Sequence, residues 1–157
     1  RSITYGESCG GFLSFLINSC PEFTEYLACS VSINGVCDQY SMYTSSDIRE
    51  FILAEGLGMN QDYIIKPEDL VKLFHHSPSS KEPLAPLLIL LGAKDRRCPY
   101  NQNLVYYKDW KSRGKDIECY VYPTMGHGLE KYESLKYDAF TRAMLYVEDK
   151  INKFHQK

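Results

Sequence analysis

The first candidate for a catalytic residue in this chain is Ser8, which has a glycine two positions before it and another two positions after it. The segment Gly6-Glu7-Ser8-Cys9-Gly10 has the pattern Gly-x-Ser-x-Gly, in which a serine sits on a sharp strand-to-helix turn with its hydroxyl exposed and the next backbone amide directed at a developing oxyanion. Residues 3–5 favour a strand before this turn, and the apolar run 12–17 favours a buried helix after it. An ordinary glycine-rich turn is the alternative interpretation, but the flanking elements favour a nucleophile at Ser8.

A serine hydroxyl is a weak nucleophile, so it needs a general base, and the base needs a partner that holds its tautomer. Asp95 follows the all-apolar run Leu87 to Leu91, and His127 follows the next expected strand. Because loops at the carboxyl ends of parallel strands converge, we predict a triad of Ser8, Asp95 and His127. The backbone amide of Cys9 would then stabilise the oxyanion. Taken singly, Asp95 also fits a turn or capping carboxylate, and His127 a loop histidine.

Other groups that could do chemistry are weaker candidates. His75 and His76 offer a rival base, but no strand precedes them, and they fit a solvated helix end. No Cys, Asp or Glu stands at zinc-ligand spacing from this pair. The sequence therefore predicts no metal and no cofactor.

The six cysteines form no C-x-x-C pair, and most have apolar neighbours. A thiol in such surroundings packs as a small hydrophobe, and a chain of 157 residues does not need disulfides to hold a core. We therefore expect reduced thiols and a cytoplasmic protein, with three disulfides as the less favoured alternative. The cysteines are Cys9, Cys20, Cys29, Cys37, Cys98 and Cys119.

The elements that would position these residues alternate as strand and helix four times, which indicates an α/β layer fold with a mostly parallel sheet flanked by helices. Leu87 to Leu91 is apolar without alternation, as in a strand buried on both faces. In the intervening stretch, Asp47 is a candidate helix cap and Pro67 a candidate helix start. In the last helix, one apolar face is expected to bury against the sheet; it comprises Phe140, Met144, Val147, Ile151 and Phe154.

Composition excludes two classes of partner. The chain is 44% hydrophobic and carries a formal charge of −2, with both signs scattered along it. It has no basic stripe for nucleic acid and no polybasic patch for an anionic membrane, and no apolar run approaches the ~18 residues that span a bilayer. The chain begins in an apparent strand without an initiator Met, so we interpret residues 1–157 as part of a longer protein.

Several motifs together resemble the acylaminoacyl-peptidase branch of the prolyl oligopeptidase family of serine peptidases. Ser8 and Asp95 are 87 residues apart (95 − 8), and Asp95 and His127 are 32 apart (127 − 95), which is similar to that family's spacing. The matching segments are Gly6-Glu7-Ser8-Cys9-Gly10-Gly11-Phe12, Ser46-Asp47-Ile48, Leu90-Leu91-Gly92-Ala93-Lys94-Asp95-Arg96-Arg97-Cys98-Pro99, Tyr106-Tyr107, Tyr122-Pro123 and Gly126-His127.

The resemblance implies the C-terminal half of an α/β-hydrolase catalytic domain, without the β-propeller and the N-terminal strands. It implies a peptidase that acylates Ser8 with short or N-acylated peptides and releases N-acylated amino acids. Arg97 matches an arginine that holds a substrate carbonyl or supports the site; a structural ion pair is the alternative. Cys9 stands where the family often has His or Tyr, which changes the pocket wall.

Two other functions remain open from the sequence. Gly-Glu-Ser-x-Gly-Gly also resembles the elbow of carboxylesterases, although the Asp-Arg-Arg-x-Pro segment and the short step to His127 argue against one. The chain could also be a catalytically silent fragment. We expect these 157 residues alone to be weakly active or inactive, and to associate with themselves or with the missing N-terminal part, because the 3–5 strand would expose an unpaired edge.

Overall fold

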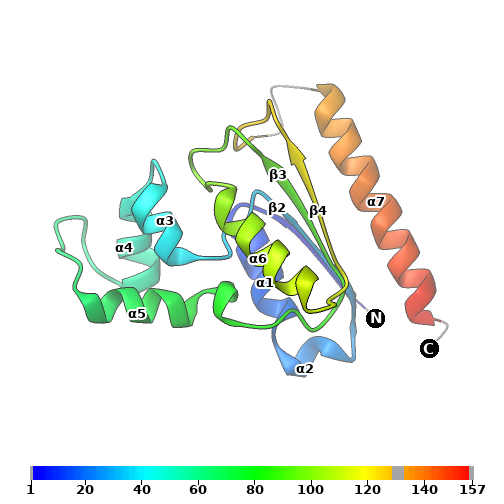
Figure 1. Ribbon diagram of the computed structural model, residues 1–157, viewed down its shortest axis with the longest axis horizontal. Helices are drawn as coiled ribbons and strands as arrows, with labels where there is room; N and C mark the ends of the chain where they lie inside the picture. Colours follow the sequence, from blue (N-terminus) through cyan, green and yellow to red (C-terminus); the bar gives the residue numbers. More distant parts are fainter. Residues whose placement is uncertain (1, 129–132, 156–157) are drawn as a thin grey trace.

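A computed structural model describes residues 2–128 and 133–155, which form a four-stranded sheet with helices on both faces (Figure 1). The strands are β1 (Ser2–Glu7), β2 (Leu27–Ile33), β3 (Leu87–Gly92) and β4 (Ile117–Tyr122), all parallel and in the order β1-β2-β3-β4. The helices are α1 (Cys9–Asn18), α2 (Pro21–Thr24), α3 (Gln39–Ser45), α4 (Arg49–Leu57), α5 (Pro67–His76), α6 (Asn101–Ser112) and α7 (Glu133–His155), with a 3₁₀ turn η1 (Pro78–Ser80).

The side chains of β3 point alternately to the two faces of the sheet, so the core has two layers. Leu87, Ile89 and Leu91 pack with Phe15 of α1 and Tyr106 of α6 on one face of the sheet. Leu88 and Leu90 face α7 on the other side, and Figure 1 shows α7 alone on that face. Every residue of β2 and β3 is buried, because helices cover both faces of a parallel sheet. The predicted α/β fold is confirmed.

The stretch between β2 and β3 forms a lobe beside the sheet, at the left of Figure 1. Helices α3, α4 and α5 close over a small core that contains Met42, Ile52 and Leu73. Pro67 begins α5 as predicted. The prediction that Asp47 caps a helix is wrong: α4 has Ile48 at its N-cap position without a side-chain cap bond. Asp47 lies instead beside Arg97, with 3.7 Å between Oδ1 and Nε.

The predicted buried face of α7 is only partly correct. Val147 is 9% exposed, but Phe140 is 54% exposed and Met144 is 37% exposed. Ala139 and Ala143 are fully buried instead, because small side chains let the helix backbone approach the sheet closely. The apolar stripe of α7 is therefore wider than the surface that these four strands cover.

The uncovered part of that stripe continues onto the free edge of the sheet. Among the described strands, β1 pairs only with β2, and Tyr5 on β1 is 44% exposed. Tyr5 lines a hollow of about 320 Å³ with Tyr137 and Phe140 of α7. Within residues 2–128 and 133–155, no helix is both long and apolar enough to cross a bilayer.

Candidate active site

Ser8 occupies the turn between β1 and α1 in a strained conformation. Its φ of 56° and ψ of −118° cost roughly 1–3 kcal/mol in a residue other than glycine. Hydrogen bonds hold the turn: the Ser8 amide donates to the Ile33 carbonyl at 3.0 Å, and the Phe12 amide donates to the Ser8 carbonyl at 3.0 Å. A Cβ at position 6 would lie 2.3 Å from the Gly10 carbonyl, so only glycine fits there. The turn therefore presents Ser8 as the Gly-x-Ser-x-Gly pattern predicts.

Asp95 lies in the loop after β3, and its carboxylate is fixed from two sides. Oδ1 accepts hydrogen bonds from the backbone amides of Arg97 at 2.8 Å and Cys98 at 2.9 Å. Oδ2 lies 2.8 Å from Nδ1 of His127. The side chain is fully buried. Such a carboxylate orients a histidine and favours its cationic form.

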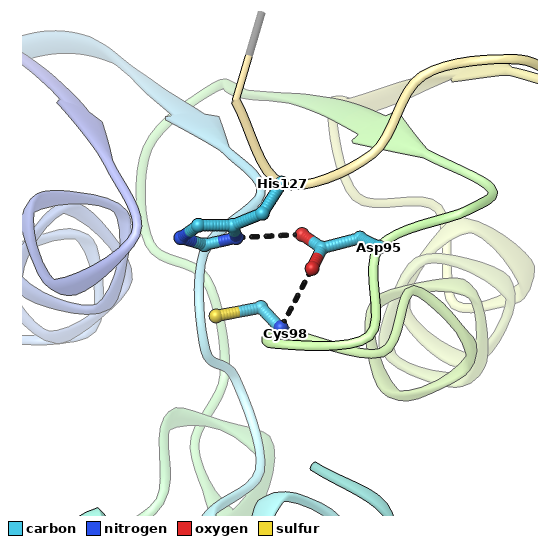
Figure 2. Close-up of side chains that lie close together, drawn as sticks. All are labelled: Asp95, Cys98 and His127. Carbon is cyan, nitrogen blue, oxygen red and sulfur yellow. Dashed lines mark hydrogen bonds and ion pairs between the residues drawn. The ribbon is translucent and has the colours of Figure 1, made fainter. Parts of the chain in front are cut away.

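His127 joins the other two predicted residues into one hydrogen-bonded chain. Its Nδ1 faces Asp95 and its Nε2 lies 3.0 Å from Oγ of Ser8; Figure 2 shows the ring directed at the Asp95 carboxylate. Because an ionised carboxylate only accepts hydrogen bonds, Nδ1 carries the proton and Nε2 is free to accept one from Ser8. The three residues predicted from the strand ends therefore meet at hydrogen-bonding distance, although 119 residues separate Ser8 from His127.

The N-terminus of α1 lies directly after Ser8. The helix begins at Cys9, and the first amides of a helix have no acceptor within it and carry the positive end of its dipole. The Cys9 amide is therefore available to an anion beside Ser8, while its thiol is exposed. The rival histidines, His75 and His76, lie in the last turn of α5.

Arg97 lies at the rim of the site. It lines a hollow of about 520 Å³ together with Lys94, Arg96 and His127. Its side chain is about half exposed, and its Nε lies 3.7 Å from Asp47. A surface ion pair of this kind contributes little, about 0–1 kcal/mol, so it leaves the guanidinium free to turn toward a ligand in the hollow.

Cys98 is a neighbour of the triad that the motif analysis did not single out. It is 2% exposed, its thiol interacts with Ser8, and burial raises the pKa of the thiol to about 12. A protonated thiol is a poor nucleophile, so Cys98 does not compete with Ser8. The sequence signal that could have identified Cys98 was its position in the Asp-Arg-Arg-x-Pro segment, three residues after Asp95.

Asn34 is the other site residue that the sequence analysis missed. It follows β2, is 1% exposed and has a φ of 45°, a left-handed conformation that Asn tolerates better than most residues. Its Nδ2 donates to the carbonyls of His127 at 2.8 Å and Gly126 at 3.3 Å, and its Oδ1 accepts from the Gly92 amide at 2.7 Å. Asn34 thereby ties the loop of His127 to the end of β3.

Replacing Asn34 by Ala is expected to slow the reaction of Ser8 with a fluorophosphonate by about 10- to 100-fold, because a displacement of about 1 Å at a reacting group has an effect of that size. The free energy of unfolding should also fall by about 1–3 kcal/mol, since buried polar groups lose their partners. Labelling kinetics and denaturant unfolding measure the two effects.

The matched control is Asn103→Ala. Asn103 is fully buried, and its Nδ2 donates to the Gly35 carbonyl at 2.8 Å. It should lose comparable stability while Ser8 keeps its reactivity within about twofold. Equal effects on labelling from both variants would show that Asn34 supports the fold and does not position His127.

Comparison with known proteins places this geometry in a family. Residues 1–154 match the prolyl oligopeptidase family. Acylamino-acid-releasing enzymes from Mus musculus and Sus scrofa are 34% and 35% identical to this chain over 151 residues, which cover 94% of it and 20% of each relative. The chain thus spans about a fifth of the length of the curated relatives that it matches.

Solved structures agree on the fold. An acylaminoacyl peptidase from Pyrococcus horikoshii has a TM-score of 0.71 and 24% identity, covering 94% of this chain and 23% of that one; at this identity the likeness concerns the fold alone. An acylaminoacyl peptidase in complex with Z-Gly-Gly-Phe-chloromethyl ketone has the same TM-score at 26% identity, with the same coverage of both chains. Both support an α/β-hydrolase sheet.

Proposed function

We propose, since this chain belongs to the prolyl oligopeptidase family, that it carries the catalytic residues of a serine peptidase that acts on short peptides and releases N-acylated amino acids. The observation that carries the proposal is the chain of hydrogen bonds from Asp95 through His127 to Ser8, at 2.8 Å and 3.0 Å. The relatives named as acylamino-acid-releasing enzymes support the choice of substrate.

In the proposed reaction, Nε2 of His127 accepts the proton of Ser8 as Oγ bonds to the substrate carbonyl carbon. The Cys9 amide donates to the resulting oxyanion, and Asp95 stabilises the imidazolium. His127 then gives the proton to the departing amine nitrogen, which leaves an acyl-enzyme on Ser8. Water, deprotonated by His127, attacks the ester, and Ser8 regains its proton as the acid product departs.

A second oxyanion donor is part of the proposal. In this fold it comes from a loop that precedes the nucleophile, and we place it outside these 157 residues. Losing one such donor lowers turnover by roughly 10²–10³, so the chain by itself should be weakly active. We propose accordingly that residues 1–157 form part of a larger catalytic domain.

The free edge of β1 supports association of the chain. Tyr5 on β1 and the apolar residues Tyr137 and Phe140 of α7 are all exposed around one hollow, and an unpaired parallel strand offers backbone groups to a further strand. We propose that the missing part of the domain or a second copy of the chain covers this surface. The six free thiols support a cytoplasmic location.

The test compares an N-acyl-aminoacyl anilide with a simple activated ester in the intact protein that contains this chain. When kcat/KM is divided by the rate of the uncatalysed reaction, a peptidase should give a larger value for the anilide than for the ester. An enzyme that hydrolyses the ester and leaves the anilide untouched is a carboxylesterase, which would overturn the proposal. Labelling by a fluorophosphonate at a residue other than Ser8 would overturn the triad.

For Arg97→Ala we expect a larger loss of kcat/KM with the anilide than with the ester, by about tenfold or more. A side chain that binds a peptide carbonyl contributes to the transition state only when that carbonyl is present. The matched control is Arg96→Ala, because Arg96 lines the same hollow. This substitution should change kcat/KM for both substrates alike. Equal losses for Arg97→Ala would indicate that its contact with Asp47 serves the fold.

A further inference from the structure

Cys98 brings a third metal-ligating side chain to the acid and base of the triad. One ligand atom each from Asp95, Cys98 and His127 lies within 4.8 Å of the other two. Figure 2 shows the Cys98 side chain close to both the His127 imidazole and the Asp95 carboxylate. Asp95 and Cys98 are buried, and His127 is half-buried at the rim of the hollow. Cys98 has no role in the proposed hydrolysis, although Asp95 and His127 do.

We propose that Asp95, Cys98 and His127 form a binding site for a single zinc-type divalent ion, and that its occupation reversibly switches off the serine nucleophile. The ligands are Sγ of Cys98, Nδ1 of His127 and a carboxylate oxygen of Asp95, with water in the fourth position. The effect on turnover rests on the proposed function, whereas ion binding does not.

The three ligand atoms need only small shifts to reach the separations that a zinc ion requires. Zn–N and Zn–O bonds of about 2.0–2.1 Å and Zn–S bonds of about 2.3 Å put tetrahedral donors roughly 3.3–3.8 Å apart. Nδ1 and Oδ2 lie 2.8 Å apart, so an ion between them would separate them by about 0.5 Å. The ligand atoms lie within 4.8 Å of one another, so the sulfur would approach the other two by up to about 1 Å. The amides of Arg97 and Cys98 hold the other carboxylate oxygen, and such outer contacts orient a ligand.

The charge of the three ligands and the softness of their donor atoms determine which metal ion the site prefers. One thiolate and one carboxylate neutralise a 2+ ion, so no net charge is buried. A thiolate together with an imidazole favours Zn²⁺, Co²⁺ or Cd²⁺ over Mg²⁺ and Ca²⁺, which prefer oxygen ligands. Within residues 2–128 and 133–155, Cys98 is the one cysteine that lies in a group of three possible metal ligands.

Binding would inactivate the base through its tautomer. As the Zn–S bond forms, the Cys98 thiol releases its proton to solvent. As the Zn–N bond forms at Nδ1, the ring proton moves to Nε2, so no further proton leaves the ring. Nε2 then points an N–H at Ser8 and can no longer accept its proton, and the nucleophile is not activated.

The test titrates the intact protein with Co²⁺ as a spectroscopic substitute for Zn²⁺. We expect a thiolate-to-cobalt charge-transfer band that Zn²⁺ displaces, and inhibition of turnover by Zn²⁺ that a chelator reverses. Cys98→Ala should lose the band and need at least about tenfold more Zn²⁺ for half-inhibition. The matched thiol control, Cys20→Ser at the start of α2, should keep both.

Ser8→Ala separates this inference from the proposed function, because it should bind Co²⁺ with the same band while having no turnover. If the protein proves not to be a peptidase, the band still tests the ion site. A cobalt band that survives in Cys98→Ala, or its absence from the unsubstituted protein, would overturn the inference. Should Cys98→Ala fail to fold, zinc X-ray absorption on the unsubstituted protein decides: a sulfur neighbour supports the site, and only nitrogen and oxygen neighbours exclude it.

Discussion

Replacing His127 by Ala is expected to reduce turnover by a factor of thousands. Its Nε2 lies 3.0 Å from Oγ of Ser8, and no other base in the described site reaches that oxygen. The substitution removes the base that accepts the serine proton and the acid that protonates the leaving amine, so both halves of the reaction slow. Steady-state kinetics of the intact protein with an N-acyl-aminoacyl anilide measure the loss.

The control for this prediction is His76→Ala. His76 lies in the last turn of α5 and is exposed, so its loss should change kcat by less than about twofold. Far-ultraviolet circular dichroism checks that each variant is folded. If His127→Ala retains more than a tenth of the turnover, His127 is a bystander and the proposed mechanism is wrong.

The second large effect is expected for Asp95→Asn, with turnover lower by roughly 10⁴, the loss seen when the acid of a Ser-His-Asp triad becomes an amide. The amide oxygen can keep the contacts with the backbone amides of Arg97 and Cys98. Its NH₂ group then faces His127 and donates to Nδ1. This contact forces the proton onto Nε2, and Ser8 loses its acceptor.

Because Asp95 is buried behind His127 and does not reach the hollow, kcat should fall while KM stays within about threefold. Asp69→Asn is the matched control: this carboxylate is also buried and accepts from Tyr63 and the Lys66 amide, but it belongs to α5. It should lower stability and leave kcat nearly unchanged. A similar loss of kcat in both variants would contradict a specific role for Asp95.

The sequence alone predicted that Ser8, Asp95 and His127 come together, because parallel strands bring their carboxyl ends to one edge of a sheet. Leu87 to Leu91 indicates a buried strand, Asp95 and His127 follow this strand and the next expected one, and the Gly-x-Ser-x-Gly pattern indicates Ser8. The structure places the three side chains within hydrogen-bonding distance. Their catalytic roles remain predictions that the variants above test.

Side-chain contacts between distant loops left no comparable local signal. Asn34 lies 93 residues from His127, whose carbonyl it binds, and an Asn-Gly pair in a sequence indicates only a turn. Asp47 has the residue type of a helix cap, but α4 begins two residues later and Asp47 lies beside Arg97. In both cases the partner belongs to another loop, so only the packed structure reveals it.

The last helix, α7, shows most clearly what the sequence could not predict. Its periodicity identified an apolar stripe correctly, but periodicity describes one helix and not the width of the sheet beneath it. Ala139 and Ala143 let α7 approach the sheet, so burial shifts toward them and leaves Phe140 exposed. The alternating strands and helices and the grouping of Ser8, Asp95 and His127 were thus predicted from local pattern and the rules of parallel sheets. Tertiary packing decided the buried face of α7, the contact of Asn34 with the His127 loop and the approach of Cys98 to the triad, because each depends on which surfaces meet.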